Sequence, residues 1–170
     1  MPGSNRITAA LPLTLLVAGV LAGCQPHERD RPSRGPESVL AGSTLVSVNA
    51  LAVPAGAAEV VLQDAAVVPE SGIRPEYPYC RFRPGGPTAA PRVIGPPSVY
   101  LVTSLQYDER GARRGNETRP VVWFVLQGGP QSAGGQLGCA VPFSAPSRLF
   151  VTPAEVQGAV GGYFNLTAAP

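Results

Sequence analysis

The sequence predicts a mainly β fold, a small antiparallel β-sandwich or barrel-like domain with one short helix near the C-terminus. Beyond residue 42, short runs of β-branched and aromatic residues alternate with polar residues, which is the two-residue period of half-buried strands. The chain also contains 20 prolines and 20 glycines. Because both residue types interrupt helices and favour turns, they indicate many short strands rather than long helices.

The shorter strands are expected in three segments, residues 43–49, 58–63 and 163–167. In the first of these, Thr44, Val46 and Val48 alternate with polar residues. Alternate residues of a strand point to the same side, so we expect these three side chains to form its buried face. The same pattern places Val60 and Leu62 together in the second segment.

The longest alternating pattern covers residues 98–108. Its expected buried face carries five residues, Val99, Leu101, Thr103, Leu105 and Tyr107. Tyr100 and Val102 interrupt the polar side of this pattern. Residues 121–126 are apolar on both sides, which predicts a central strand that is covered on both faces. The charged segment 108–119 is expected to form an exposed, hairpin-like connection between these two strands.

One helix is predicted near the C-terminus. Thr152 and Glu155 have the spacing of a capping box, in which each side chain bonds the main-chain N–H of the other residue. The proline after Thr152 suits the first helical position. A helix of two turns is therefore expected over residues 153–160, with Gly161 or Gly162 supplying a left-handed stop.

The N-terminal segment has the pattern of an export signal. Arg6 precedes an apolar run over residues 7–22, which is shorter than the roughly 20 apolar residues that a membrane-spanning helix needs. The run ends in four residues, Leu21, Ala22, Gly23 and Cys24. This ending resembles the lipobox of bacterial lipoproteins. The resemblance implies cleavage before Cys24 and acylation of its sulfur, and Gln25 in place of aspartate implies the outer membrane, facing the periplasm.

Three regions follow from this interpretation. Residues 1–23 form a lipoprotein signal peptide, and residues 24–42 form a lipidated tether rich in proline and charge. Residues 43–170 form a single β-rich periplasmic domain of ordinary size. The membrane would then be a partner only through the N-terminal lipid.

The domain contains two cysteines, Cys80 and Cys139. An exported protein meets an oxidising compartment, so this even pair predicts a disulfide. A redox or metal-binding thiol pair is the alternative. It is disfavoured because the chain has no Cys-x-x-Cys spacing and no histidine near these positions.

Composition excludes several kinds of chemistry. The 13 basic residues, all arginine, nearly balance the 11 acidic residues, so no basic surface for nucleic acid is expected. His27, the only histidine, lies in the tether, which removes histidine triads and histidine-based zinc sites from the domain. A carboxylate pair remains as the one catalytic option. Its candidates are Glu59, Asp64, Glu70, Glu76, Asp108, Glu109, Glu117 and Glu155.

Tyr77, Tyr79, Arg81 and Arg83 form an unusual cluster beside Cys80. These side chains could clamp a sugar or an anionic ligand, or contact a partner. The simpler interpretation is a strand that enters the core at Cys80, with arginine stems packed over aromatic rings. We favour the simpler interpretation.

The predicted function is that of a non-catalytic, lipid-anchored envelope protein with a structural, assembly or protein-interaction role. The alternative is a ligand-binding module for cell-wall glycan or a small molecule, and a carboxylate-dependent hydrolase ranks third. We expect no catalytic residues, no metal and no cofactor. The expected partner is an envelope protein or a glycan, without nucleic acid.

Overall fold

The computed structural model describes residue 39 and residues 41–86, 89–130, 132–145 and 147–169. The signal peptide, Cys24, His27 and the tether up to residue 38 lie outside these residues. Ten strands, one 3₁₀ turn and one α-helix make up the described part of the chain. Within that part, no helix has the length and apolar character required to span a membrane.

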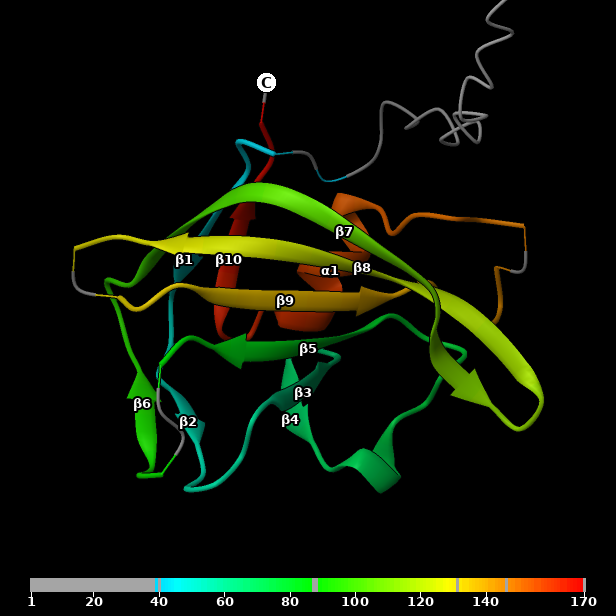
Figure 1. Ribbon diagram of the computed structural model, residues 1–170, viewed down its shortest axis with the longest axis horizontal. Helices are drawn as coiled ribbons and strands as arrows, with labels where there is room; N and C mark the ends of the chain where they lie inside the picture. The colour runs from blue at the N-terminus through cyan, green and yellow to red at the C-terminus, as the bar shows by residue number, and fades with distance from the viewer. Residues whose placement is uncertain (1–38, 40, 87–88, 131, 146, 170) are drawn as a thin grey trace, which may run out of the picture. The chain divides into compact units, whose positions relative to one another are not determined.

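A curled antiparallel sheet of eight strands, ordered β10-β1-β7-β8-β9-β5-β3-β4, dominates the fold (Figure 1). Its strands are β1 (Thr44–Ser47), β3 (Val60–Gln63), β4 (Ala66–Val68), β5 (Tyr79–Pro84), β7 (Val99–Arg114), β8 (Glu117–Gly128), β9 (Gly135–Ala140) and β10 (Phe164–Thr167). A second, two-stranded sheet pairs β2 (Leu51–Val53) with β6 (Arg92–Ile94). The mainly β prediction is confirmed, and the curled sheet gives it the barrel-like form.

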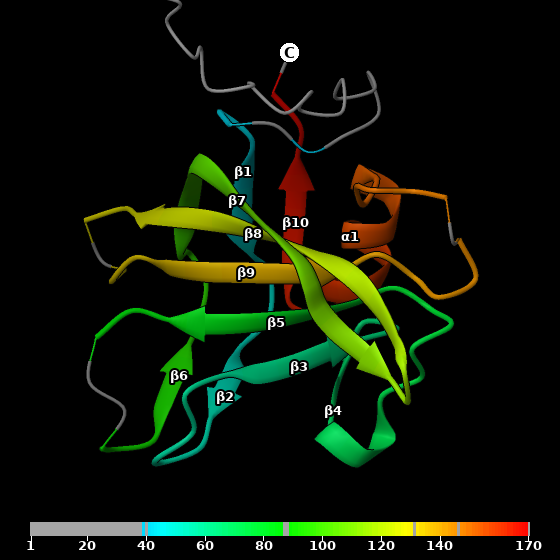
Figure 2. The same cartoon turned by 45° about the vertical axis from the view of Figure 1, so that its right-hand side comes forward.

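The sheet curls around the helix α1 (Pro153–Val160), which packs on its inner face (Figure 2). The central strand predicted at 121–126 is confirmed as the middle of β8, which lies between β7 and β9. The expected connection 108–119 is the end of the β7–β8 hairpin itself, because β7 continues to Arg114 and β8 starts at Glu117. Gly115, with φ of 57°, occupies the tight turn between them.

The buried face predicted for β7 is wrong at four of its five residues, because only Leu105 packs on the core while Thr103 and Tyr107 are exposed. Tyr100 and Val102 are each 1% exposed, whereas Val99 and Leu101 are 43% and 41% exposed. The register against β8 shifts between Val102 and Ser104, where a β-bulge adds one residue. A one-residue insertion exchanges the two faces of a strand, so the interior changes from even-numbered to odd-numbered positions and Leu105 packs on the core.

The buried face of β1 also differs from its prediction. Leu45 is buried, together with Ser43 and Ser47, and Val46 lies on the opposite face. Both serine hydroxyls have main-chain partners. The Ser47 Oγ accepts from the N–H of Ser98 at 2.9 Å, and the Ser43 Oγ accepts from Ala169 at 3.1 Å. Because these bonds satisfy the hydroxyls, serine can be buried here at little cost.

The core lies between the inner face of the sheet and α1. Its aromatic centre comprises Phe82, Tyr100 and Phe164, whose ring centroids are 5.2–6.2 Å apart. Val39, which the sequence places in the tether, is buried in this core four residues before the expected start of the domain. The predicted disulfide is present and buried, since Cys80 on β5 and Cys139 on β9 are direct partners across the two strands.

The helix α1 starts as predicted and ends differently. Thr152 and Glu155 form the expected capping box, with both reciprocal bonds present. Gly161 and Gly162 do not form a left-handed stop, because Gly161 is right-handed with φ of −60° and Gly162 has no positive φ. Glycine is needed at position 162 because there is no room for a side chain. A Cβ at this position would overlap the carbonyl oxygen of Ala65 in the β3–β4 turn.

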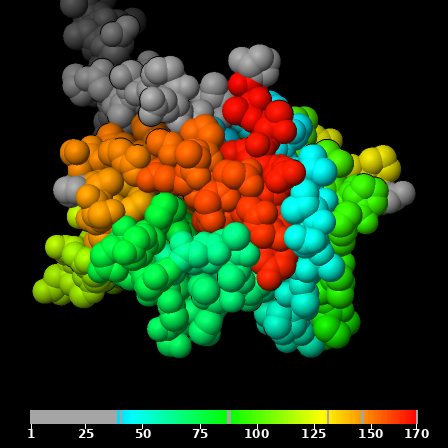
Figure 3. All heavy atoms as spheres, turned by 180° about the vertical axis from the view of Figure 1, so that it is seen from behind, coloured from blue at the N-terminus to red at the C-terminus, as the bar shows by residue number. Residues whose placement is uncertain are grey.

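The helix joins the two margins of the curled sheet (Figure 3). At β10, the Gln157 amide donates to the carbonyl of Phe164 at 3.1 Å and accepts from the N–H of Leu166 at 2.7 Å. At the β3–β4 turn, the Ala65 N–H donates to the last-turn carbonyls of Gly158 and Ala159, at 3.1 and 3.2 Å. At β10 the helix thus bonds main-chain groups that a neighbouring strand would otherwise bond. At the other margin, the β3–β4 turn bonds the free carbonyls of the helix itself.

Two glycines of this region provide a matched stability test. Gly162→Ala is expected to lower the free energy of unfolding by at least about 2 kcal/mol, because the new methyl group displaces the β3–β4 turn. Gly158→Ala meets nothing within 4 Å and is expected to raise stability by up to about 1 kcal/mol through helix propensity. Urea unfolding of both variants measures the two effects. Equal stability of the two would contradict the close approach of Gly162 to the turn.

Candidate functional site

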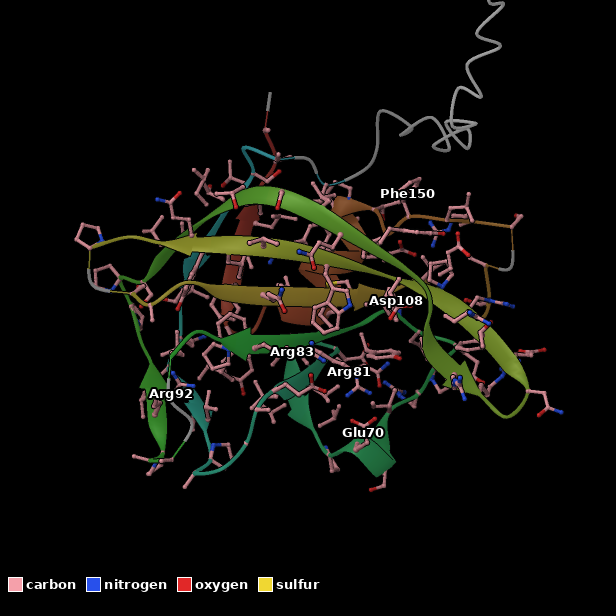
Figure 4. The ribbon with its side chains drawn as sticks, in the orientation of Figure 1. Glu70, Arg81, Arg83, Arg92, Asp108 and Phe150 are labelled. Atoms are coloured by element: carbon pink, nitrogen blue, oxygen red, sulfur yellow. A yellow bond between two sulfur atoms is a disulfide. The ribbon has the colours of Figure 1, made fainter. Side chains whose placement is uncertain are left out.

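The predicted cluster lies on the outer face of the sheet, opposite α1 (Figure 4). On β5, Cys80 and Phe82 point into the core. Side chains alternate along a strand, so Arg81 and Arg83 project from the outer face. The strand therefore enters the core at Cys80, as the simpler interpretation of the cluster requires.

Two arginines and two carboxylates form a connected chain on this face. Arg81 bonds Glu59, which precedes β3, with Nη1 to Oε1 at 2.5 Å. It also bonds Glu70 of η1 (Glu70–Gly72), with Nη1 to Oε2 at 2.9 Å. Glu59 accepts a further bond from the Nε of Arg83 at 2.7 Å. The order Glu70–Arg81–Glu59–Arg83 shows that the cluster neutralises much of its own charge, and we call these four residues the outer-face network.

Arg83 also covers the only tryptophan of the chain. Its Cζ lies 3.9 Å from the centroid of the Trp123 ring. Trp123 on β8 is the cross-strand partner of Gly138 on β9, where a Cβ would overlap the indole. The indole ring therefore packs on the main chain at Gly138, where there is no side chain, and the guanidinium of Arg83 lies above the ring. This packing leaves little free aromatic surface on which a sugar could stack.

The two tyrosines of the predicted cluster differ in their surroundings. Tyr79 is 5% exposed and packs in a small outer cluster with Phe143. Burial raises the pKa of Tyr79, and the nearby Arg81 opposes that rise only in part. Tyr77 is exposed and lies under Arg74, with 4.9 Å between the guanidinium carbon and the ring centroid. Tyr77 therefore contacts Arg74, while Arg81 and Arg83 belong to the network.

The electrostatics of Glu59 identify the network as ionic. Partial burial favours the protonated form of Glu59, but bonds from Arg83 and Arg81 outweigh burial and hold the pKa of this carboxyl below its ordinary value. A catalytic acid requires the opposite shift. Of the eight candidate carboxylates, six pair with arginine: Glu59, Asp64, Glu70, Glu76, Glu117 and Glu155. Asp108 accepts a bond from the Arg110 main-chain N–H at 3.1 Å.

A hollow of about 370 Å³ adjoins the network. It lies between η1, β5 and the end of β7, and its lining comprises Glu70, Ile73, Pro75, Tyr79, Arg81, Gly111 and Arg113. Sequence reasoning did not identify Arg113 or Trp123 as neighbours of the cluster. Both come from the β7–β8 hairpin, which only the long-range pairing of the sheet brings to this place. Within the described residues, no group of three His, Cys, Asp or Glu side chains could hold a metal ion.

No family model, no curated protein and no solved structure matches this chain.

Replacing Glu59 tests the network. Glu59→Gln is expected to lower the free energy of unfolding at pH 7 by about 1–2 kcal/mol, because Arg81 and Arg83 lose a shared charged partner. The folded-state pKa of Glu59 lies below its ordinary value of 4.5. Its contribution is therefore complete above pH 4.5 and is lost as the pH falls through the folded-state pKa.

Urea unfolding at pH 7 and at pH 3, followed by tryptophan fluorescence, measures this dependence. The difference between wild type and Glu59→Gln should shrink at the lower pH. Glu109→Gln is the matched control, because Glu109 forms no ion pair with the described residues. A difference of the same size at both pH values would show that the carboxylate charge of Glu59 does not stabilise the fold.

Proposed function

We propose that this chain is a lipid-anchored protein of the bacterial envelope whose β-domain acts without catalysis, by binding a partner protein through the outer face of its sheet. The lipobox ending in Cys24 and the charged tether after it support the anchor and a periplasmic, outer-membrane location. The ion-paired carboxylates of the outer-face network support a non-catalytic role, since Glu59 is held in its charged form.

The observation that carries the proposal is an exposed apolar area at one end of the outer face. Val99 and Leu101 of β7 are 43% and 41% exposed, and they lie directly opposite Val46 and Thr44 of β1. A groove of about 350 Å³ adjoins them, lined by Pro97, Val99, Gly129, Pro130 and Ser132. Neighbouring apolar side chains that stay exposed are typical of protein contact surfaces. We call Val46, Val99 and Leu101 the apolar patch.

A ligand-binding module is the second candidate, and the hollow beside Arg81 favours it, because its size lies within the range of small-molecule sites. Glycan is less well supported than a charged small molecule or peptide. Arg83 lies over the Trp123 ring, and stacking on a sugar needs a free aromatic face.

The anchor is tested at Cys24. In Cys24→Ser the sulfur that would carry the lipid is absent, so we expect unprocessed precursor and no incorporation of a labelled fatty acid. Metabolic labelling in the native host, with gel mobility as the measure of processing, distinguishes the two forms. Persistent label in the variant would contradict lipidation at this residue.

The apolar patch is tested by photo-crosslinking in the native envelope. A photoreactive residue at Thr44, the cross-strand neighbour of Leu101, should form one dominant adduct with a partner protein. Val99→Thr combined with Leu101→Thr should remove most of that adduct, because threonine keeps the strand propensity while polar atoms replace the contact surface. Thermal unfolding should stay close to wild type.

Val93→Thr is the matched control, because Val93 is 69% exposed but lies on β6 in the separate two-stranded sheet. This variant should keep the adduct. An adduct from Thr44 that survives in the double variant, or no adduct at all, would contradict binding through the apolar patch.

A further inference from the structure

We infer that the hollow between η1, β5 and the end of β7 receives a carboxylate group of a peptide, with an apolar side chain beside it. This inference rests on the proposed binding of a partner protein and names the chemistry of the partner segment. It is carried by Arg113 and by the apolar side chains that share the lining of the hollow.

Arg113 is the cation of the hollow that has no acidic partner among the described residues. Its neighbour Arg114 bonds Glu76 and Glu117, at 2.7 Å each. Arg81 on the opposite side is bonded by Glu59 and Glu70. Arg113 lines the hollow and forms no ion pair with any described residue. An incoming anion therefore has a guanidinium to bind without breaking an existing pair.

Three apolar or aromatic residues share the lining of the hollow with this charge. Ile73 and Pro75 follow η1, and Tyr79 lies on β5. A ligand that matches the hollow thus joins one negative group to an apolar group. The volume of about 370 Å³ is enough for a short peptide end rather than a single ion.

A bulge of β7 forms part of the rim of the hollow. Gly111 lines the hollow and lies in the second bulge of β7, where pairing with β8 lapses between Asp108 and Ala112. Residues 109–111 have no Cα partner on β8 within this bulge, and the Arg110 N–H donates to the Asp108 carboxylate instead. The guanidinium of Arg113 remains the donor for a carboxylate, since arginine can bind both carboxylate oxygens.

The charge of the wall favours a carboxylate over a phosphate. Glu70 lines the same hollow and would repel a dianion more strongly than a monoanion. A carboxylate carries a single charge, and the chain end of a peptide places it directly beside the last side chain. The geometry therefore fits a peptide that ends in an apolar residue.

The test uses the full-length lipidated protein in detergent micelles and three probes. The first probe is acetyl-Gly-Ala-Leu with a free carboxylate, the second is the same peptide as its C-terminal amide, and the third is inorganic phosphate. NMR of the arginine Nε–H groups and of the main-chain amides reports binding. We expect the free carboxylate to shift the Arg113 and Gly111 signals saturably, with an affinity at least about tenfold above that of the amide or of phosphate.

Two arginine variants make the test specific. Arg113→Gln should weaken binding of the free peptide at least about tenfold. Arg110→Gln should leave it unchanged, because Arg110 lies on the same strand but does not line the hollow. Equal binding of carboxylate and amide, equal loss in both variants, or phosphate binding as tight as peptide binding would each overturn the inference.

Failure of this inference can be distinguished from failure of the proposed function. Absence of peptide binding, combined with a Thr44 adduct that depends on the apolar patch, overturns this inference alone. Peptide binding that depends on Arg113, without any such adduct, supports the hollow as a binding site and contradicts the apolar patch.

Discussion

Closure of the curled sheet by α1 is the constraint on which the rest of the fold depends. The helix lies between β10 and the β3–β4 turn, and hydrogen bonds link it to both. The side chain of Gln157 satisfies the free main-chain groups of Phe164 and Leu166, and the Ala65 N–H satisfies the last-turn carbonyls of Gly158 and Ala159. A sheet margin with unpaired groups promotes aggregation, so this arrangement protects β10 while it covers the core.

Because α1 covers the inner face, the outer face is the side of the sheet that the helix leaves uncovered. There, the outer-face network and the Arg83–Trp123 stack are satisfied internally and hold β3, β5, β8 and β9 together. Two places on the same face lack such partners among the described residues. One is the apolar patch on β1 and β7, and the other is the hollow lined by Arg113. The two proposed contact sites therefore rely on side chains other than those that stabilise the sheet.

Local patterns predicted local features well, such as the capping box at Thr152 and the central strand at 121–126. The Cys80–Cys139 pair was predictable despite its long separation, because the domain has only these two cysteines. Other features that depend on distant partners were not found. The bulge after Val102 exchanges the faces of β7, main-chain N–H groups allow Ser47 to be buried, and the Ala65 carbonyl requires glycine at 162. Arg113 reaches the hollow only through the register of the β7–β8 hairpin.

Hydrogen exchange of the Leu166 and Ala65 amides tests the closure by α1 most directly. Both N–H groups bond to α1, so neither depends on a neighbouring strand for its protection. Closure predicts that both amides exchange slowly, at rates close to those of core amides such as Leu45 and Phe82. Exchange of either amide at the rate of an exposed loop, in otherwise folded protein, would show that α1 does not close the sheet.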